Sequence, residues 1–420
     1  MMKTAQQIQS AQAPKWHKFG LLGSLYVSQH IPLTFANDAL PVFLRSQNVS
    51  LSSISLLSLL ALPLVFKCFW SPLIDRFGFT RWGHYRFWIL CFQGLLVGAI
   101  ALLSFLDSTQ QFIPLLMGLL FISIFSASQD IATDALAVGL LSPSERGFGN
   151  GIQKGGNSLG AVIGGGGMLI LLGLAGWRIT LLVMAGVLAL ALIPVVRHRE
   201  QINECIDIAA AQPANRGGYK RLFTVFRRPG MGRWFTILVL YGIGPYMALT
   251  MFRPLLVDLG LSLGGIGLLL GVASYAAGAV GSLVAGLTIA QLGRKRSLVW
   301  FSGFQVIAIA AYASPTLGLT ALPLLYLIAM LAQFINSMAI TALFTVMMDK
   351  SDVKTAGTDY TAQSSVIYIS GIVGAVFSGI IAQSIGYGGV FLVALGFSLL
   401  TVIAIIQLFP KPVKPSHVLK

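Results

Sequence analysis

Long apolar runs separated by short polar loops cover almost the whole chain. Each run holds about 20 residues, the length that a helix needs to cross the ~30 Å hydrocarbon core of a bilayer. The pattern predicts an all-α membrane protein with twelve transmembrane helices. These helices are expected near residues 19–43, 51–71, 87–106, 112–141, 147–172, 177–196, 234–258, 263–289, 297–314, 319–348, 357–382 and 388–409.

The basic residues fall mainly on one side of these spans. With the N-terminus placed inside, Arg45 and Arg178 lie in external loops, Lys67, Lys154 and Arg253 lie within spans, and the other 23 of the 28 Lys and Arg residues are cytoplasmic. Since cytoplasmic loops carry an excess of Lys and Arg, we expect both ends of this multi-pass chain in the cytoplasm.

Composition supports the same class of protein. Only 10% of the residues are charged, whereas soluble domains carry about 25%. The net charge of +15 comes from the short loops, so the expected partner is the lipid bilayer and not nucleic acid. The three cysteines fit neither a disulfide framework nor a metal site, and the polar start of the chain predicts an uncleaved tail.

The chain also repeats itself. VSLSSISLL at residues 49–57 matches LSLGGIGLL at 261–269, and SPLIDRFG at 71–78 is echoed by GLTIAQLG at 286–293. Internal similarity of this kind indicates duplication. The predicted units are an N-terminal six-helix bundle with a short tail (1–196), a cytoplasmic linker loop (197–232) and a C-terminal six-helix bundle with a short tail (233–420).

SPLIDRFG resembles the loop motif G-x-L-x-D-R-x-G-R-R of major facilitator transporters, with Asp75, Arg76 and Gly78 at its core positions. The second half keeps GRKR at 293–296 but lacks the Asp-Arg pair. The resemblance implies two bundles around a cavity that opens to one side at a time.

It also implies that Asp75, Arg76 and Gly78, with Arg86 and Arg146, form a cytoplasmic gate. A solvated loop that only sets the topology is the alternative.

A narrower resemblance rests on KCFWSPLIDR, SASQDIATDALAVGLL and ERGFGNGIQKGG. These segments are similar to the branch that contains muropeptide permeases and siderophore permeases of the rhizobactin and pyochelin type. The resemblance implies import of a siderophore or ferric siderophore across the bacterial inner membrane. Import of a muropeptide, an anhydro-sugar peptide, is the alternative, and proton-driven drug export is a second one.

Three charges are expected inside the fourth and fifth spans. Asp130 and Asp134 are four residues apart and share a helix face, and Lys154 lies at a similar depth on the next span. We expect Lys154 to pair with one of them, which leaves the other carboxylate to carry a proton. The alternative is a buried charge network that only fastens the two helices.

On the outer side, Asp38 and Arg253 occupy equivalent first helices of the two halves. They are candidates for an outer gate, and Arg253 is also a candidate for binding an anionic ligand. In the remaining alternative, Arg253 only extends to the membrane surface.

Further polar residues fall within the spans. His30 is either a proton relay or a hydrogen-bonded core residue, and Lys67 is expected to extend to the membrane surface. The amides that either line the substrate cavity or bond across helices are Gln29, Gln129, Gln153 and Asn157.

The sequence therefore predicts a secondary active transporter, monomeric and driven by protons. It shows no nucleotide-binding motif, and no set of groups for nucleophilic catalysis or metal binding is visible among its five His and three Cys residues. Neither enzymatic activity nor a cofactor is expected.

Overall fold

The structure, a computed structural model, describes residues 15–47, 49, 56–78, 82–106, 111–198 and 224–409. Within these ranges every regular element is helical. Most of the predicted linker, 197–232, lies outside the described residues, and the limits of the predicted units stay a prediction.

The N-terminal half begins with a helix that changes its winding twice. α2 (Lys15–Thr34) passes through a π-helical turn, Phe35–Ala39, into α3 (Leu40–Ser46). The second predicted span is broken into a 3₁₀ turn (Leu56–Ala61), α5 (Leu62–Phe66), a second 3₁₀ turn (Lys67–Phe69) and α6 (Ser71–Arg76). The remaining elements are α7 (His84–Leu103), α8 (Phe112–Leu140), α9 (Arg146–Ala161), a π-helical turn (Val162–Gly167), α10 (Met168–Leu190) and α11 (Leu192–Arg197).

The C-terminal half follows the same order. Its elements are α14 (Met231–Asp258), α15 (Leu263–Ile266), a π-helical turn (Gly267–Ala273), α16 (Ser274–Leu292), α17 (Arg294–Tyr312), a 3₁₀ turn (Ser314–Leu317), α18 (Leu322–Lys350), a 3₁₀ turn (Val353–Thr355) and α19 (Ala356–Leu408).

Two glycines mark equivalent corners in the halves. Gly176 inside α10 has φ of 75°, and Gly386 inside α19 has φ of 72°. These positive φ angles suit glycine because it has no Cβ. Each corner separates two predicted spans. The helical stretches Arg146–Arg197 and Val353–Leu408 therefore each contain two predicted membrane crossings.

Among the described residues, eight helices are long and apolar enough to cross a membrane, and two of these contain the glycine corners. The first two predicted spans are not among the eight, and π and 3₁₀ turns interrupt both. Each of the twelve predicted spans is mostly helical where it is described. The predicted fold class is therefore confirmed.

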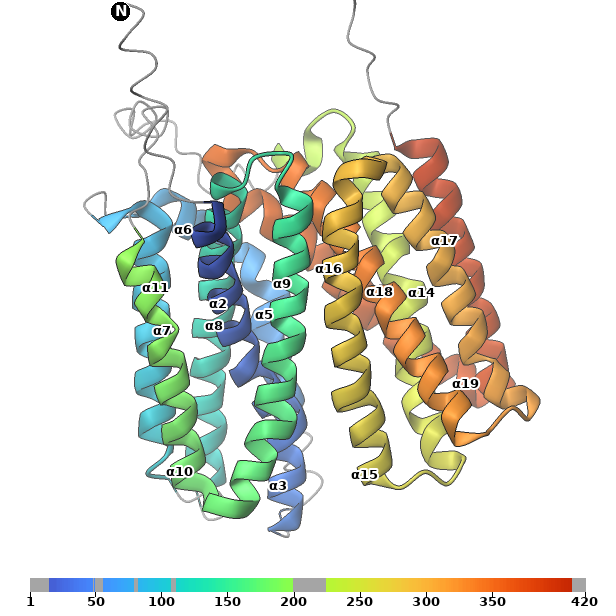
Figure 1. Ribbon diagram of the computed structural model, residues 1–420, viewed down its shortest axis with the longest axis horizontal. Helices are drawn as coiled ribbons and strands as arrows, with labels where there is room; N and C mark the ends of the chain where they lie inside the picture. Colours follow the sequence, from blue (N-terminus) through green and yellow to red (C-terminus); the bar gives the residue numbers. More distant parts are fainter. Residues whose placement is uncertain are drawn as a thin grey trace, which may run out of the picture.

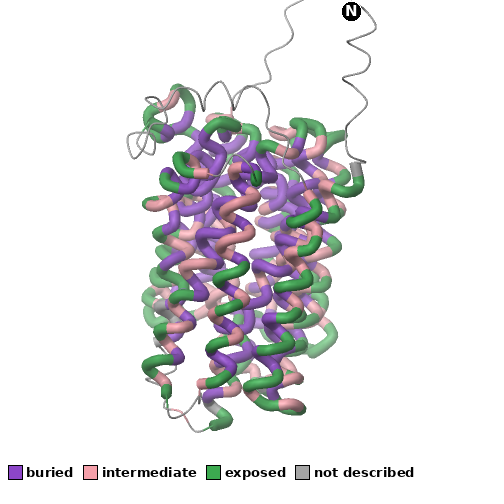
Figure 2. The backbone as a smooth tube through the Cα atoms, turned by 90° about the vertical axis from the view of Figure 1, so that its left-hand side faces the viewer, coloured by how far each residue is buried: buried purple, intermediate pink, exposed green. Residues whose placement is uncertain are grey.

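The helices form two bundles that stand side by side, α2 to α11 in one and α14 to α19 in the other (Figure 1). Exposed residues run along the outer faces of the helices (Figure 2). Many are large and apolar, such as Leu174 and Leu102, which are 81% and 72% exposed. Apolar surface of this extent suits contact with lipid.

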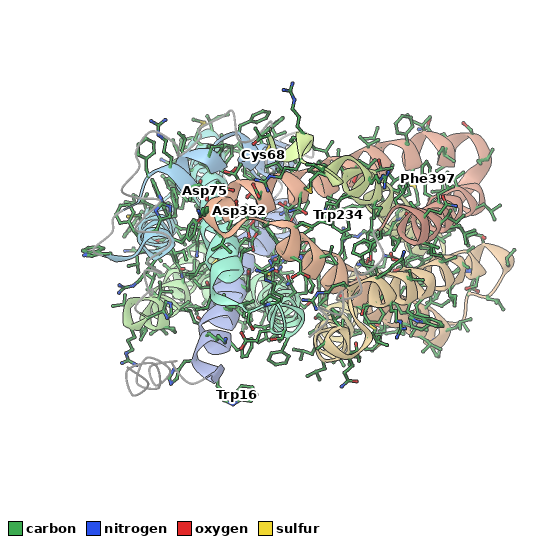
Figure 3. The ribbon with its side chains drawn as sticks, turned by 90° about the horizontal axis from the view of Figure 1, so that it is seen from above. Trp16, Cys68, Asp75, Trp234, Asp352 and Phe397 are labelled. Carbon is green, nitrogen blue, oxygen red and sulfur yellow. The ribbon has the colours of Figure 1, made fainter. Side chains whose placement is uncertain are left out.

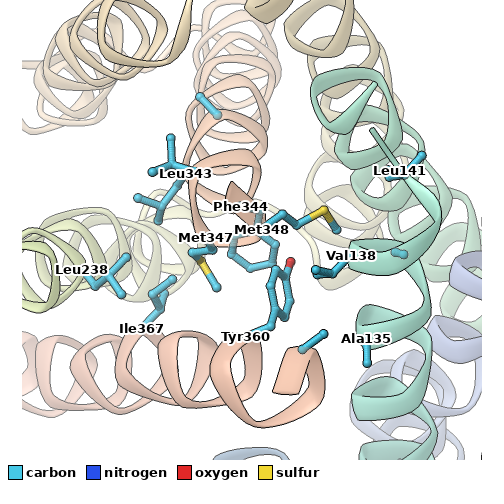
Figure 4. Packing of buried hydrophobic residues seen from close by; sticks show 14 of the residues in the cluster. Ala135, Val138, Leu141, Leu238, Leu343, Phe344, Met347, Met348, Tyr360 and Ile367 are labelled. Carbon is cyan, nitrogen blue, oxygen red and sulfur yellow. The ribbon is translucent and has the colours of Figure 1, made fainter. Parts of the chain in front are cut away.

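Three buried apolar clusters divide the molecule along its length. One lies wholly within the N-terminal half, between Ile31 and Leu188, and another wholly within the C-terminal half, between Met247 and Ala394. The third contains residues of both halves. In it, Tyr360 and Met348 face Ala135 and neighbouring residues of α8 across the boundary (Figure 4).

The shared cluster lies at the end of the bundles that carries α6 and the start of α19, which we term the closed end. The opposite end carries α3 and α15, and we term it the open end. There each half has an apolar core of its own.

Candidate functional site

Lys67 and Asp130 form an ion pair inside the N-terminal bundle. The 3₁₀ turn between α5 and α6 places the Lys67 side chain, which is only 1% exposed, against Asp130 of α8. The expectation that Lys67 extends to the membrane surface is wrong. A carboxylate at bilayer depth needs a partner, and Lys67 supplies it.

Asp134 is buried and lies one helical turn along α8. Its Oδ1 accepts hydrogen bonds from the hydroxyl of Tyr26, at 3.0 Å, and from Nε2 of Gln153, at 2.9 Å. No ion pair to Asp134 is present in the described part of the chain. Asp134 therefore has neutral donors as its direct partners, and Oδ2 is left for a proton.

Lys154 does not pair with either aspartate, so the predicted pairing is wrong. Its Nζ lies 3.6 Å from the ring centroid of Phe344, on α18 of the other half. Beside it, the hydroxyl of Tyr360 donates to Oε1 of Gln153 at 3.4 Å. The polar residues of α9 thus contact aromatic residues of the C-terminal half, which relates this network to the boundary between the bundles.

A cavity of about 210 Å³ extends from Asp130 toward the open end, and we term it the charged cavity. Of the predicted site residues, its wall contains Gln29, His30, Asp38, Asp130 and Asn157, and the other lining residues are Leu33, Thr34, Asn37, Leu64, Ser126, Tyr275 and Tyr368. Polar groups from three helices of one half and two of the other converge on it, as in a ligand site.

Gln129 lies outside this wall. Its Nε2 donates to Oε1 of Gln93 at 2.7 Å, and Nε2 of Gln93 donates to the carbonyl oxygen of Leu188, also at 2.7 Å. Gln129 therefore bonds across helices and does not line the charged cavity, which is the second of the two predicted alternatives. Gln29 combines both, because it lines the cavity and donates to Oγ1 of Thr133 at 2.8 Å.

At the open end, Asp38 and Arg253 are both exposed, and these two described residues form no ion pair with each other. Both are near enough to Tyr275 for their charges to act on it. The predicted outer gate is thus not closed in this state.

At the closed end, Asp75 of α6 binds the first turn of α19. Its carboxylate accepts from the backbone N–H groups of Gly357, at 3.1 Å, and Thr358, at 2.7 Å, and from the Thr358 hydroxyl at 2.6 Å. The Tyr85 hydroxyl adds a fourth hydrogen bond at 2.9 Å. A carboxylate at a helix N-terminus satisfies free N–H groups and the helix dipole. Asp75 and Asp352 lie close together when seen from above (Figure 3).

Arg76 and Gly78 of the loop motif make contacts close to Asp75 in the sequence. The Arg76 guanidinium lies 5.4 Å from the ring centroid of Phe77. At Gly78, a Cβ atom would lie 2.0 Å from Nδ1 of His84, so only glycine leaves room for this ring.

Arg86 binds the end of a helix in its own half. Its Nε and Nη2 donate to the carbonyl oxygens of Val195, at 2.9 Å, and Val196, at 2.5 Å. These carbonyl groups lie in the last turn of α11, where the helix itself supplies no N–H donor for them. Arg86 therefore caps a helix.

Arg146 joins the halves through Asp349 of α18, at 2.9 Å. The same carboxylate accepts from Nε of Arg294, at 2.6 Å, and Arg294 also binds the carbonyl oxygen of Pro143. Asp349 and Arg294 were missed as site residues. The GRKR segment was the available signal, because it gives α17 a basic start beside the end of α18.

Residues 24–375 match the family description of the Major Facilitator Superfamily. The chain belongs to this superfamily. Its members are permeases rather than enzymes, and the chain is a multi-pass membrane protein of this superfamily.

Among Major Facilitator Superfamily relatives, the anhydromuropeptide permease of Escherichia coli K12 is 30% identical over 289 residues. The match covers 67% of this chain, and the chain spans 57% of the length of that permease. A Rickettsia conorii protein named as a transporter, AmpG 4, is 23% identical over 86% of this chain and 89% of its own length.

Two solved structures share the fold at low sequence identity. The transporter FucP in its outward conformation superposes with a TM-score of 0.70 at 14% identity, over 94% of this chain and 99% of that one. A bacterial homologue of the iron transporter ferroportin, in its outward-facing state, gives 0.66 at 16% identity over the same shares.

Proposed function

We propose that the protein imports a muropeptide, an anhydro-sugar peptide, across the bacterial inner membrane as a monomer. The observation that carries this proposal is the 30% identity to a permease named for that substrate. Siderophore import, the function that the sequence motifs favoured, has no such support. The relatives favour its alternative, the muropeptide.

We assign the closed end to the cytoplasm, so that the charged cavity faces outward. This orientation follows from the basic residues, because cytoplasmic ends are rich in Lys and Arg. The closed end carries Arg76, Arg86, Arg146, Arg228 and Arg294, together with Lys18 and Lys295. The separate apolar cores at the open end agree with an outward-facing state.

We further propose that Asp134 carries the coupled proton. Asp130 already has Lys67 as its partner, whereas Asp134 receives only neutral donors from Tyr26 and Gln153 directly. A buried carboxylate without a paired cation is favoured in its protonated form. When the bundles rearrange, the contacts of Gln153 with Tyr360 change, which links the proton site to the boundary between the halves.

The test is uptake of a labelled anhydromuropeptide by cells that lack their own permease. Wild-type protein should give uptake that stops when the proton gradient is collapsed. Asp134→Asn should lose gradient-driven uptake by about tenfold or more and keep exchange of labelled for unlabelled muropeptide. Asp258→Asn is the matched control, since that carboxylate lies at the open end and accepts from Tyr387.

Three results would contradict the proposal. Uptake of a ferric siderophore without uptake of muropeptide would restore siderophore import as the function. Export of hydrophobic cations would favour the drug exporter. Full proton dependence in the Asp134→Asn protein would remove the coupling role from this residue.

A further inference from the structure

A second cavity lies inside the C-terminal bundle, and its chemistry differs from that of the charged cavity. It has a volume of about 170 Å³, and we term it the amide cavity after Gln305, Gln333 and Asn336 in its wall. The other lining residues are Tyr241, Gly242, Pro245, Tyr246, Leu249, Ala308, Ile309, Tyr312, Ala332, Ile340 and Ile367. No Asp, Glu, Lys, Arg or His belongs to this described wall.

The amides of this cavity have unused hydrogen-bonding capacity. Nε2 of Gln305 donates to Oδ1 of Asn336 at 2.9 Å, and within the described chain the Gln333 side chain makes no hydrogen bond. Each amide group offers two donors and an acceptor with two lone pairs. The wall can therefore bind a ligand that both donates and accepts hydrogen bonds.

A buried glutamine of the other half is used differently. Gln93 of α7 is buried, as is Gln305 of α17. Gln93 donates to the Leu188 carbonyl and accepts from Gln129. The amide of Gln93 serves packing between helices, whereas that of Gln305 lines an open space.

Tyr246 relates the two cavities. This residue lines the amide cavity and lies within electrostatic range of Tyr275 and Tyr368, which line the charged cavity. Gly371 of α19 sets the position of its ring, because a Cβ there would lie 2.9 Å from the Tyr246 ring. Ligand sites usually measure about 300–1,000 Å³, so a bulky substrate would need both cavities.

Building on the proposed function, we propose that the amide cavity binds the sugar part of the substrate, a neutral ring that carries acetamido and hydroxyl groups. The peptide part, which carries ammonium and carboxylate groups, then lies in the charged cavity beside Asp130 and Asp38. The tyrosine faces of the amide cavity suit the flat apolar sides of a sugar ring. An acetamido group has an N–H donor and a carbonyl acceptor, so it can form complementary hydrogen bonds with the amides of this cavity.

The test uses the full chain in lipid nanodiscs and measures binding of three probes: N-acetylglucosamine, glucose and a free alanyl-glutamyl-lysine tripeptide. Wild-type protein should bind N-acetylglucosamine about tenfold more tightly than glucose. Gln305→Leu should weaken binding of N-acetylglucosamine by about tenfold and change that of the tripeptide by less than twofold. Gln93→Leu, the matched control, should leave the affinities of both probes within twofold of wild type.

Asn336→Ala is a second variant, on a neighbouring helix, and it should lose binding of N-acetylglucosamine in the same way. It replaces Gln305→Leu in the test if that variant does not fold. An unchanged affinity for N-acetylglucosamine in a folded variant would overturn the assignment, as would equal binding of glucose. Binding of the labelled muropeptide to wild-type protein is measured in parallel. If it is absent, the proposed function fails, whereas a muropeptide that binds without a sugar-specific loss contradicts only the amide cavity.

Discussion

The charged residues at the two ends of the molecule make different contacts. At the closed end, Asp75 accepts four hydrogen bonds and Asp349 binds arginines from both halves. At the open end, Asp38 and Arg253 are exposed and form no ion pair with each other. Among the described residues, these polar contacts across the halves therefore lie at the closed end, an asymmetry that fits the proposed alternating-access mechanism.

The largest expected effect lies between the two ends, where Lys67 pairs with Asp130. Lys67→Met leaves a carboxylate without its cation and should lower the free energy of unfolding by about 3–5 kcal/mol. Lys154→Met removes a cation–π contact and should cost about 0.5–2 kcal/mol. Thermal unfolding in nanodiscs compares the two variants, and a larger loss for Lys154→Met would contradict the pairing of Lys67 with Asp130.

Breaking the Asp75 contacts should release the closed end. Asp75→Asn weakens charge-assisted hydrogen bonds to the start of α19, at a cost of about 2 kcal/mol. A cysteine introduced at Ala356, which is fully buried, should then react with a thiol reagent about 30 times faster. The control is Asp352→Asn, since Asp352 accepts from Lys354 in its own turn and should leave the rate unchanged.

The open end should tolerate the loss of its charges. Because no bond joins Asp38 to Arg253, Asp38→Asn and Arg253→Gln should each change the free energy of unfolding by less than about 0.5 kcal/mol. A loss above about 2 kcal/mol in a thermal melt would mean that the pair is bonded in the resting protein and that the contrast between the ends is wrong.

A pH-dependent effect is expected at a peripheral ion pair of the closed end. Burial raises the pKa of the Glu145 carboxyl, but hydrogen bonds from Lys18 and Ser142 outweigh it, so the net pKa is lowered. Because the pKa is lower in the folded protein, the ionised Glu145 stabilises the fold. This stabilisation is complete above the unfolded-state pKa of about 4.3 and is lost as the pH falls through the folded-state pKa. Glu145→Gln should cost less than about 1 kcal/mol at pH 7 and less at pH 3 than at pH 7. An equal cost at both pH values would exclude the ion pair as the cause.

The helices were predictable from sequence because hydrocarbon thickness fixes the length of an apolar run. The Asp75 motif was also found, since its residues are contiguous. The partner of Asp75, the first turn of α19, was not predicted. Its contacts are mainly backbone N–H groups, which almost every residue has, so the sequence does not single them out.

The charge pairing of the fourth span was predicted incorrectly for a geometric reason. The prediction treated the second span as a regular helix, which places Lys67 near the membrane surface. The 3₁₀ turns on both sides of α5 change its winding, and Lys67 then points at Asp130. Lys154, predicted as the partner, instead lies against Phe344 of a helix far away in sequence.

The most direct test of alternating access measures two distances in one protein by electron paramagnetic resonance. Spin labels at Phe77 and Val353 report on the closed end, and labels at Val42 and Val257 report on the open end; all four side chains are exposed. On addition of anhydromuropeptide at low pH, the open-end distance should shorten and the closed-end distance should lengthen. If both distances stay fixed while the labelled substrate is transported, or if both change in the same direction, the two ends do not alternate and the carrier mechanism is contradicted.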